Sequence, residues 1–598
     1  MSVFFPDFVL QHARDRPERA AVVFAGHDTP DETVTYAELD RSARRIAHWL
    51  GGAGVAEGDR VLLLLPTGLD FVKAFLGCMY AGTVPVPAPQ PGGQRHHLAR
   101  TAGIARDAAV SAVFTDGDSL AGVADWLRED GFGTVLCETP AGAEAGGEAT
   151  AWRRPGNAGP GALAFLQYTS GSTSDPKGVM VAHGHLGHNL ALMQAALQVD
   201  GDDDFCSWLP LYHDMGLIGL LLLPLYLGST TTLLSAVDFL KRPQLWLEIV
   251  DRQRVAVTSA PSFAYDLCAR RLTDDQVAGL DLSQWRIACN GAEPIDPAVL
   301  ERFAKRFAPA GFRGASFLPC YGMAETTLFI SGRPPAEEPL VLDVDPAALE
   351  QNRLLPVGPD GTGRPLVSCG SVRGLDVRVV DTVSGAEAAE GRIGEIWVRG
   401  GSVARGYWAN EEETRRTFHA VPAGAEGSGE PGFLRTGDLG AFLDGELYVT
   451  GRLKEMMIVH GRNLYPQDIE RDARGVHPSL GTLATSVFSV PAPAEEIVVV
   501  QEVRPAQLED ATLADVVARI RTVAAERHGV RIGNVVLVRP GRVEKTTSGK
   551  IRRGLMRRRF LAGELEPLHE VLDTGVRAAR ETTAGIPEAG TADAGEAA

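Results

Sequence analysis

Short apolar runs alternate with helix-length amphipathic segments along the first half of the chain. Residues 36–50 place leucine, isoleucine and alanine at helical spacing, and glycines follow. Residues 61–65 form a continuous apolar run, which is typical of a strand buried on both faces, and residues 72–80 again have one apolar helical face. Strand followed by helix is the unit that builds parallel sheets, so the pattern predicts a large α/β domain.

Further apolar runs of strand length continue this pattern, several of them separated by helix-length segments. They predict strands at residues 112–115, 134–137, 163–168, 205–209, 256–259, 286–289 and 317–321.

The pattern changes beyond Glu325. Residues 331–364 are rich in proline and contain one short predicted helix, 346–353, which indicates an inserted surface element. The short strands predicted after it indicate a small β-barrel-like subdomain that closes the first domain; they lie at 377–380, 395–398 and 446–450.

A second, smaller domain is expected at the C-terminal end. We predict an N-terminal domain at 1–450, a hinge at 451–454, a mobile α+β C-terminal domain at 455–573 and a disordered tail at 574–598, which has no aromatic residue. The predicted elements of the C-terminal domain are strands at 456–459, 497–500 and 535–538, and helices at 466–474, 513–528 and from 551 onward.

Composition excludes several classes of protein. The formal charge of −18 argues against a nucleic-acid partner, because phosphate binding needs a positive field. Seven scattered cysteines without a C-x-x-C pair indicate neither a zinc site nor a disulfide framework. The longest apolar run, 217–227, is too short for a membrane span and contains Pro224. Without an N-terminal signal pattern, we expect a cytoplasmic protein.

The segment from Tyr168 to Gly178 carries the strongest chemical signal. It reads Tyr-Thr-Ser-Gly-Ser-Thr-Ser-Asp-Pro-Lys-Gly and follows an apolar strand, so its backbone N–H groups, hydroxyls and Lys177 suit a polyphosphate. A mobile surface loop would have a similar composition. The spacing differs from the Walker pattern, which argues against a kinase of that type.

Polar motifs also follow several other predicted strands, where an open α/β sheet presents its ligand site. They are Trp208 to Gly216, Asn290 to Glu293, Tyr321 to Thr326 and Arg435 to Asp438, with Thr546 to Lys550 near the end of the chain. Together with the first loop, this ordered set resembles the motifs of the adenylate-forming superfamily of acyl and aryl ligases, over about residues 8 to 570.

Two stretches resemble the fatty acyl-AMP ligase branch of that superfamily. They are the run that begins at Ser207 and contains Tyr212, His213 and Asp214, and the run from Gly461 to Glu470. Residues 331–364 lie where that branch carries an insertion. The resemblance implies a large N-terminal domain of packed α/β sheets and a small mobile C-terminal lid.

The resemblance also implies a role for individual residues. Lys550 on the lid bridges the carboxylate and the α-phosphate, His213 positions the carboxylate, and Glu325 binds magnesium. Hard oxygen ligands suit that ion. The expected ATP- and AMP-binding residues are Thr169, Ser170, Gly171, Ser172, Thr173, Lys177, Asn290, Gly291, Ala292, Tyr321, Gly322, Met323, Thr326, Asp438 and Arg452, and Lys454 marks the hinge.

Each of these residues also has a purely structural interpretation. Glu325 fits the N-terminus of a helix, Tyr321 fits a buried core position, Asp438 fits a turn, and a single histidine such as His213 is often structural. The apolar segments 217–223 and 259–265 are candidates for an acyl pocket, but core packing explains them equally well.

The resemblance implies ATP- and magnesium-dependent activation of a medium- or long-chain fatty acid, followed by transfer to an acyl carrier protein. No carrier segment follows residue 570, so a stand-alone carrier is expected. A basic cluster fits either a carrier dock or a solvated face; it comprises Arg552, Arg553, Arg557, Arg558 and Arg559. An acyl-CoA synthetase and a non-catalytic adenylate-binding protein are the alternatives.

Overall fold

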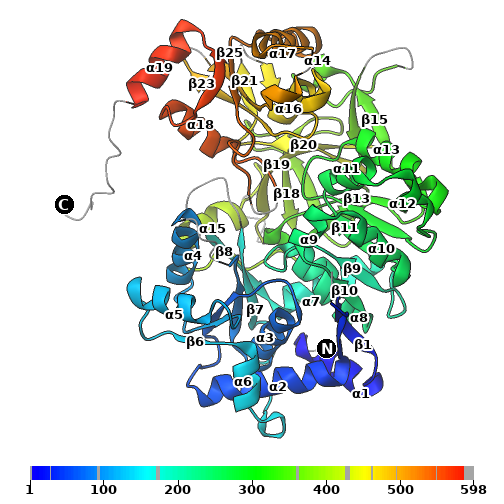
Figure 1. Cartoon of the computed structure of the whole chain (residues 1–598), viewed down its shortest axis with the longest axis vertical. Helices are drawn as coiled ribbons and strands as arrows, with labels where there is room; N and C mark the ends of the chain where they lie inside the picture. Colours follow the sequence, from blue (N-terminus) through cyan, green and yellow to red (C-terminus); the bar gives the residue numbers. More distant parts are fainter. Residues whose placement is uncertain are drawn as a thin grey trace.

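The computed structural model describes residues 3–26, 29–90, 95–169, 176–358, 363–424, 431–459, 462–492, 495–508, 510–546 and 549–584, with the backbone alone at 95–97 and 583–584. Figure 1 shows a large lower part, which contains the N-terminal half of the chain, and a smaller upper part formed by the C-terminal residues.

An eight-stranded sheet organises the large part. Its central strands are parallel, and antiparallel strands close both edges. In sheet order they are β14 (Phe329–Gly332), β13 (Phe317–Gly322), β12 (Ile287–Asn290), β11 (Val257–Ala260), β9 (Phe205–Ser207), β10 (Thr231–Leu233), β1 (Ala20–Phe24) and β2 (Glu32–Thr35).

A second, wholly parallel sheet has the order β4 (Val84–Pro87), β3 (Arg60–Leu64), β5 (Ala112–Thr115) and β6 (Leu136–Glu138). The predicted strand at 163–168 is β7 (Leu163–Thr169), which pairs with β8 (Lys177–Ala182) in an antiparallel hairpin. Leu62, Leu166 and Tyr168 belong to one hydrophobic cluster, so the hairpin packs against this second sheet.

Helices cover both sheets, as an α/β fold requires. They are α1 (Pro6–Asp15), α2 (Tyr36–Gly52), α3 (Leu69–Tyr80), α4 (Arg95–Asp107), α5 (Leu120–Glu129), α6 (Pro140–Gly146), α7 (His183–Leu197), α8 (Leu223–Leu227), α9 (Ala236–Lys241), α10 (Gln244–Arg252), α11 (Ser262–Arg271), α12 (Asp274–Ala278) and α13 (Pro297–Phe307). The Thr35 hydroxyl and Glu38 form a capping box that begins α2, where the apolar spacing predicts a helix.

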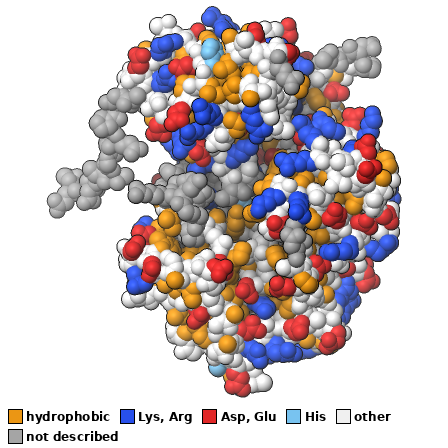
Figure 2. All heavy atoms as spheres, in the orientation of Figure 1, with side chains coloured by type: hydrophobic (Ala, Val, Ile, Leu, Met, Phe, Trp, Pro, Cys, Tyr) orange, Lys and Arg blue, Asp and Glu red, His pale blue; other side chains and the backbone are white. Residues whose placement is uncertain are grey.

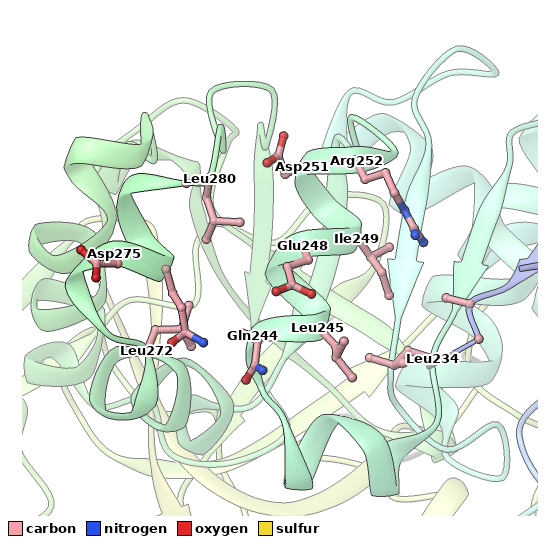
Figure 3. A pocket seen from close by; sticks show the side chains of 14 residues that line it. Leu234, Gln244, Leu245, Glu248, Ile249, Asp251, Arg252, Leu272, Asp275 and Leu280 are labelled. Atoms are coloured by element: carbon pink, nitrogen blue, oxygen red, sulfur yellow. The ribbon is translucent and has the colours of Figure 1, made fainter. Parts of the chain in front are cut away.

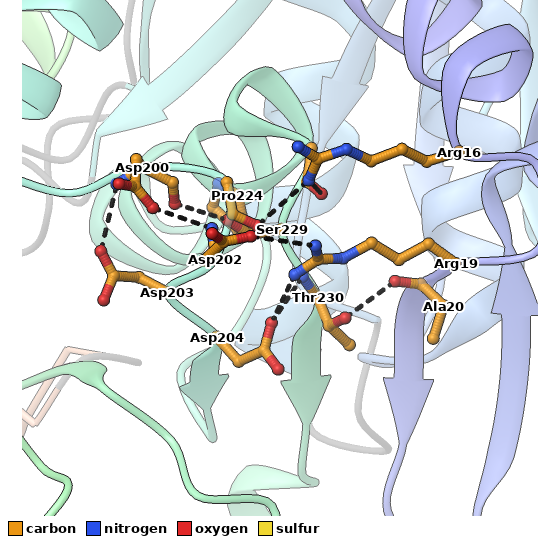
Figure 4. Close-up of polar contacts among 12 residues, drawn as sticks. Arg16, Arg19, Ala20, Asp200, Asp202, Asp203, Asp204, Pro224, Ser229 and Thr230 are labelled. Carbon is orange, nitrogen blue, oxygen red and sulfur yellow. Dashed lines mark hydrogen bonds and ion pairs between the residues drawn. The ribbon is translucent and has the colours of Figure 1, made fainter.

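An acidic turn ties the start of the chain to the large sheet. Asp204 accepts a hydrogen bond from Thr230 N at 3.0 Å and pairs with Arg19 at 3.2 Å. The Thr230 hydroxyl donates to Ala20 O at 2.9 Å, while Asp200 O accepts from the Ser229 hydroxyl (Figure 4). These contacts hold β1 beside β10 although their sequences lie about two hundred residues apart.

The predicted β-barrel-like subdomain is a four-stranded antiparallel sheet, β17 (Asp376–Val380), β18 (Gly394–Arg399), β19 (Leu434–Leu443) and β20 (Glu446–Arg452), with α15 (Glu411–Phe418) between β18 and β19. The proline-rich stretch before it contributes a small hairpin of β15 (Val341–Val344) and β16 (Arg364–Val367), and α14 (Pro346–Leu349) lies between these strands.

The smaller part has its own four-stranded sheet, β23 (Thr485–Pro491), β24 (Glu495–Glu502), β25 (Asn534–Val538) and β26 (Pro567–Val571). A short hairpin, β21 (Met457–Val459) and β22 (Arg462–Leu464), precedes it, and α16 (Pro466–Gly475), α17 (Leu513–His528) and α18 (Arg553–Leu561) pack around it. Two hydrophobic clusters built only from residues 457–576 form its core.

The predicted disorder from residue 574 is wrong for the described residues there, because a helix, α19 (Thr574–Ala584), follows. Val576 is fully buried, and Arg580 forms two hydrogen bonds of 2.8 and 2.9 Å to the Glu570 carboxylate. Its guanidinium also lies 5.6 Å from the Phe560 ring centroid. These contacts supply the burial that composition alone does not indicate.

Polar contacts join the two parts of the molecule. Arg462 forms a two-point ion pair with Glu350, and the Asn463 amide donates to Asn352 Oδ1 at 3.0 Å. Arg364 Nη1 lies 2.9 Å from Asp468 Oδ2. The proline-rich stretch therefore contacts the C-terminal domain, and Figure 2 shows Lys and Arg side chains on both sides of the boundary.

Candidate functional site

Three of the predicted motifs follow strands of the large sheet and lie at one edge of it. Strands β9, β11, β12 and β13 are parallel, and they end at Ser207, Ala260, Asn290 and Gly322. Because the carboxyl ends of parallel strands share one edge, the segments that follow them converge there.

The phosphate-loop prediction falls only partly on described residues. Thr169 ends β7 and pairs with Lys177, which begins β8, so the loop connects two strands of a hairpin. Ser170, Gly171, Ser172 and Thr173 lie outside the described residues. Lys177 Nζ lies 2.5 Å from Glu413 Oε1 and 5.1 Å from the Tyr407 ring centroid.

Glu325 lies in a 3-10 turn immediately after β13. Its carboxylate Oε1 accepts a hydrogen bond of 2.9 Å from the Tyr407 hydroxyl, and its carbonyl accepts one of 2.9 Å from Ala404 N. Burial raises the pKa of Glu325, whereas the Tyr407 hydrogen bond acts in the opposite direction. The sequence motif gave no indication of Tyr407, which lies 82 residues away.

Asp438, Tyr321 and Arg452 form one group. The Tyr321 hydroxyl donates to Asp438 Oδ2 at 2.7 Å, and Arg452 Nε lies 3.2 Å from Asp438 Oδ1. Asp438 is buried while half of the Arg452 side chain is exposed. Nearby Asp438 raises the pKa of Arg452. Three of the residues expected to bind the nucleotide thus contact one another, and the Tyr321 hydroxyl is engaged by Asp438.

The segment from Asn290 to Ala292 begins at the last residue of β12, and its three residues have different surroundings. Asn290 is fully buried, and its side-chain amide donates to Ala260 O at 3.2 Å. The Asn290 side chain is therefore engaged within the sheet, which leaves the backbone of this segment for contact with an adenine ring. A Cβ on Gly291 would lie only 2.9 Å from Cys320 O of β13, so the close packing of the chain at this point favours glycine. Ala292 is exposed at a φ of +67°.

The motif after β13 folds into a tight turn. A Cβ on Gly322 would meet Leu328 O at 1.9 Å, and Met323 N donates to Leu328 O at 2.8 Å. The buried Thr326 hydroxyl donates to Met323 O at 2.9 Å. Thr327 has a φ of 68°, and strain of this kind is typical of functional segments. The predicted residues Gly322, Met323 and Thr326 thus shape the turn that holds Glu325.

His213 precedes a π-helix at Met215–Leu222, which occupies the apolar run. Its pKa is lowered to about 3, first by burial and then by the nearby cations Lys550 and Arg100. The imidazole is therefore neutral at physiological pH. A neutral imidazole suits the expected positioning role, because a carboxylate substrate needs no deprotonation.

Lys550 reaches the same cleft from the C-terminal domain. Thr546 O accepts a hydrogen bond from Gly549 N at 2.9 Å, and Lys550 N donates to the Thr546 hydroxyl at 3.1 Å. Lys550 is exposed to solvent, but the protein around it and the nearby Arg452 lower the pKa of its ammonium group. Three nearby carboxylates act in the opposite direction and raise the pKa of Lys550; they belong to Asp214, Asp438 and Glu293.

Three charged residues at the site were missed from the sequence. Asp214 and Glu293, whose pKa values burial raises, both lie near Lys550. Arg100 on α4 lies near His213 and Arg552, and burial lowers its pKa. Asp214 and Glu293 fall inside the predicted motifs, so motif spacing could have found them. Nothing in the local sequence marks Arg100.

Metal binding by the protein alone is not supported. The described residues contain no group of three or more His, Cys, Asp and Glu side chains that could hold a metal ion. Tyr407 engages one carboxylate oxygen of Glu325, Oε1. A single hard oxygen ligand of this kind fits Mg²⁺ that is held mainly by substrate phosphates.

The two apolar segments that we considered for an acyl pocket are largely core. Leu217 to Leu223 are buried except for Gly219, which is intermediate, and the Tyr265 hydroxyl donates to Cys289 O at 2.9 Å. Phe263 is only partly buried and contacts the Trp208 ring. A separate surface cavity of about 470 Å³ lies between α10 and α12, and it contains none of the predicted site residues (Figure 3).

The five arginines of the basic cluster do not form one free surface. Arg553 pairs with Glu455 and Glu470, and Arg559 pairs with Glu544 at 2.6 Å. Arg557 and Arg558 are exposed. In the described part of the chain, no helix is long and apolar enough to cross a membrane.

Comparison with protein families gives two matches. The model described as AMP-binding enzyme matches residues 9–408. The model described as Disco-interacting protein 2-like, AMP domain, matches residues 454–570.

Individual relatives cover nearly the whole chain. The medium-chain-fatty-acid–[acyl-carrier-protein] ligase JamA of Moorena producens is 40% identical over 554 residues, which are 89% of this chain and 91% of that protein. The putative fatty-acid–CoA ligase fadD25 of Mycobacterium tuberculosis is 36% identical, over 92% and 96% of the two chains.

The solved structures agree with these relatives. A structure from a study of fatty acyl-adenylate ligases of E. coli and L. pneumophila superposes with a TM-score of 0.85 at 32% identity, covering 94% of this chain and 98% of the other. The chain therefore belongs to the AMP-binding enzyme family and, within it, to the fatty acyl-AMP ligases.

Proposed function

We propose that the protein activates a medium- or long-chain fatty acid with ATP, releases pyrophosphate, and transfers the acyl group to the phosphopantetheine thiol of an acyl carrier protein. One observation carries this proposal: Gly549 of the C-terminal domain lies against Phe263 of the large domain, where a Cβ on the glycine would be 3.6 Å from the ring, and the adjacent Lys550 is thereby near His213, Asp214 and Asp438. A lysine brought to a phosphate site by a separately folded lid is able to stabilise the negative charge that develops in the transition state.

In the first step, a carboxylate oxygen of the fatty acid attacks the α-phosphorus of ATP. A bond forms between that oxygen and the phosphorus, the bond from the α-phosphorus to the bridging oxygen breaks, and pyrophosphate leaves. Both reactants are anions, so catalysis depends on positioning and neutralisation. Lys550 and Lys177 supply positive charge, and neutral His213 orients the carboxylate.

Magnesium fits this site through Glu325 together with the phosphates of ATP. When bound, the ion neutralises phosphate charge. Asp438 is buried beside Arg452 and Tyr321, and in this proposal its carboxylate accepts hydrogen bonds from the ribose hydroxyls in place of those partners.

In the second step, the phosphopantetheine thiol loses its proton to solvent and attacks the acyl carbon. The new carbon–sulfur bond replaces the bond to the AMP oxygen, and AMP leaves. A rotation of the C-terminal domain about the predicted hinge at Lys454 would withdraw Lys550 before this step. Exposed Arg557 and Arg558 suit an acidic carrier surface. We expect that carrier to be a separate chain and the enzyme to be cytoplasmic.

The proposal is tested by mass spectrometry of the products. The purified protein receives ATP, Mg²⁺ and fatty acids from C8 to C16, with CoA in one tube and a phosphopantetheinylated carrier in another. We expect acyl-AMP in both tubes and acylated carrier in the second. Abundant acyl-CoA in the first tube would contradict the choice of acceptor.

An acyl-CoA ligase is the second candidate, because one relative at 36% identity carries the name of a putative fatty-acid–CoA ligase. A non-catalytic adenylate-binding protein would give neither product. It is disfavoured because all four charged residues expected for the first step, Lys550, Lys177, Glu325 and Asp438, are present.

A further inference from the structure

Tyr407 occupies a fixed position between the phosphate-loop hairpin and the turn that holds Glu325. Its backbone pairs with Val179 of β8, and its N–H donates to the Thr414 hydroxyl at 2.9 Å. Its ring meets Phe418 edge-on, with the centroids 5.2 Å apart, and the residue is only 6% exposed. Packing of this kind leaves the Tyr407 side chain a single orientation.

Two functional groups meet at this tyrosine. Its hydroxyl donates to Glu325 Oε1 at 2.9 Å, and the Lys177 ammonium lies 5.1 Å from its ring centroid. Lys177 is also paired with Glu413 on α15 at 2.5 Å. A line of four contacting side chains, Glu413, Lys177, Tyr407 and Glu325, therefore links the phosphate loop to the carboxylate expected to hold the metal.

Backbone hydrogen bonds hold the loop that carries Tyr407 to both β8 and the turn that contains Glu325. Ala404 N donates to Glu325 O at 2.9 Å, and Arg405 N donates to Met180 O of β8 at 3.1 Å. Met180 N in turn donates to Gly406 O at 2.9 Å. Tyr407 thus cannot shift without disturbing either β8 or the Glu325 turn.

We propose that Tyr407 is a positioning residue for nucleotide-bound Mg²⁺. By holding Oε1 of Glu325, it would leave Oε2 available to the ion, and its ring holds the Lys177 ammonium at the start of β8. The inference rests on the proposed function, because it needs ATP and Mg²⁺ at this site. Partners that orient a metal-binding carboxylate typically change metal affinity or activity by about 10- to 100-fold when they are removed.

The substitution Tyr407→Phe tests the hydroxyl alone, because phenylalanine keeps the ring that packs on Phe418 and underlies Lys177. The measurement is Mn²⁺ binding, followed by electron paramagnetic resonance, to the full-length enzyme with a non-hydrolysable ATP analogue. Tyr226→Phe is the control, since it also removes a tyrosine hydroxyl that has a side-chain partner, here Gln194 at 3.3 Å, and it lies outside the predicted motifs.

We expect Tyr407→Phe to raise the Mn²⁺ concentration for half-saturation about tenfold or more, with an unchanged melting temperature and unchanged metal-free analogue binding. Tyr407→Leu should also weaken analogue binding without metal, because the ring under Lys177 is lost. Equal Mn²⁺ binding by Tyr407→Phe, Tyr226→Phe and the wild type would overturn the inference. A wild-type protein that binds no ATP analogue would overturn the proposed function itself.

Discussion

At the scale of single residues, the site is defined by titratable groups whose pKa values the surrounding protein shifts. Burial lowers the pKa of Lys550 and of His213, and it raises the pKa of Asp214, Glu293 and Glu325. Such opposed shifts within one cleft are characteristic of a functional site. They also mean that an anionic substrate with its bound cations would partly offset the cost of holding these charged groups within the protein.

Replacing Lys550 by alanine should reduce acyl-AMP formation about 100- to 1,000-fold, which is the usual cost of losing one preorganised donor to a transition-state oxyanion. Transfer from supplied acyl-AMP to the carrier should change little, because Lys550 has no role in that step. Both half-reactions are measured by mass spectrometry, with Lys305→Ala on the surface of α13 as the control. Equal loss in both half-reactions would refute the assigned role.

Arg100→Gln should weaken ATP binding about tenfold, because it removes a cation near His213 from a site proposed to hold two anionic substrates. The melting temperature should stay constant or rise, because Arg100 lies near another cation, Arg552. Calorimetric titration with ATP and thermal unfolding measure the two effects, and exposed Arg128→Gln is the control. Normal ATP affinity combined with a lower melting temperature would make Arg100 a structural residue.

Buried His183 predicts a specific pH dependence of stability. Burial lowers its pKa to about 3, and its Nδ1 accepts a hydrogen bond from Phe5 N at 3.2 Å. Between about pH 6.5 and 3, the unfolded chain binds a proton here and the folded chain does not, so stability falls as pH falls.

His183→Asn keeps an acceptor but removes that titration. The free energy of unfolding of the wild type should therefore fall more steeply between pH 7 and 5 than that of the variant, by up to about 1.4 kcal/mol per pH unit. Urea unfolding at several pH values measures the slopes, with His419→Asn at an exposed position for comparison. Parallel slopes for all three proteins would disprove the prediction.

At the scale of elements, strong periodicity was a reliable guide. The helix predicted at 513–528 is α17 with the same limits, and the predicted strands at 112–115 and 377–380 are β5 and the larger part of β17. Elements whose stability comes from distant partners were missed. Strand β8 depends on pairing with β7, and short β10 depends on its neighbours β9 and β1.

The same reasoning explains what the motifs did and did not indicate at the site. Composition and position marked the loop that contains Lys177, whereas the family resemblance of other polar segments implied roles for His213, Glu325, Asp438 and Lys550. Tyr407 and Arg100 come from segments without such a signal, and only tertiary packing places them there. Asn290 was expected among the nucleotide-binding residues, and the structure adds that its side-chain amide holds β12 to β11.

Helix α19 provides a test at this scale. A chain truncated after Asp573 loses buried Val576 and the Arg580 pair with Glu570, and we expect its C-terminal domain to lose about 2 kcal/mol of stability. A chain truncated after Ala584 keeps both and should match the full-length protein. Thermal unfolding distinguishes the two truncations, and identical curves would mean that α19 adds no stability.

At the scale of the whole molecule, the chemistry depends on two separately packed domains meeting in one arrangement. The contacts from Arg462 to Glu350 and from Arg364 to Asp468 join the domains through the proline-rich stretch, while Lys550 enters the cleft. This arrangement suits the adenylation step. The acyl transfer step needs Lys550 withdrawn, so the predicted hinge at Lys454 has to allow a second arrangement.

The central claim is that a fatty acid carboxylate attacks the α-phosphorus of ATP. The most direct measurement uses a fatty acid with both carboxylate oxygens labelled with ¹⁸O, together with ATP, Mg²⁺ and the carrier protein, and determines the mass of the released nucleotide. Adenylation predicts AMP that carries one ¹⁸O atom, because one carboxylate oxygen remains on phosphorus after acyl transfer. Unlabelled AMP, or ADP as the nucleotide product, would contradict the account.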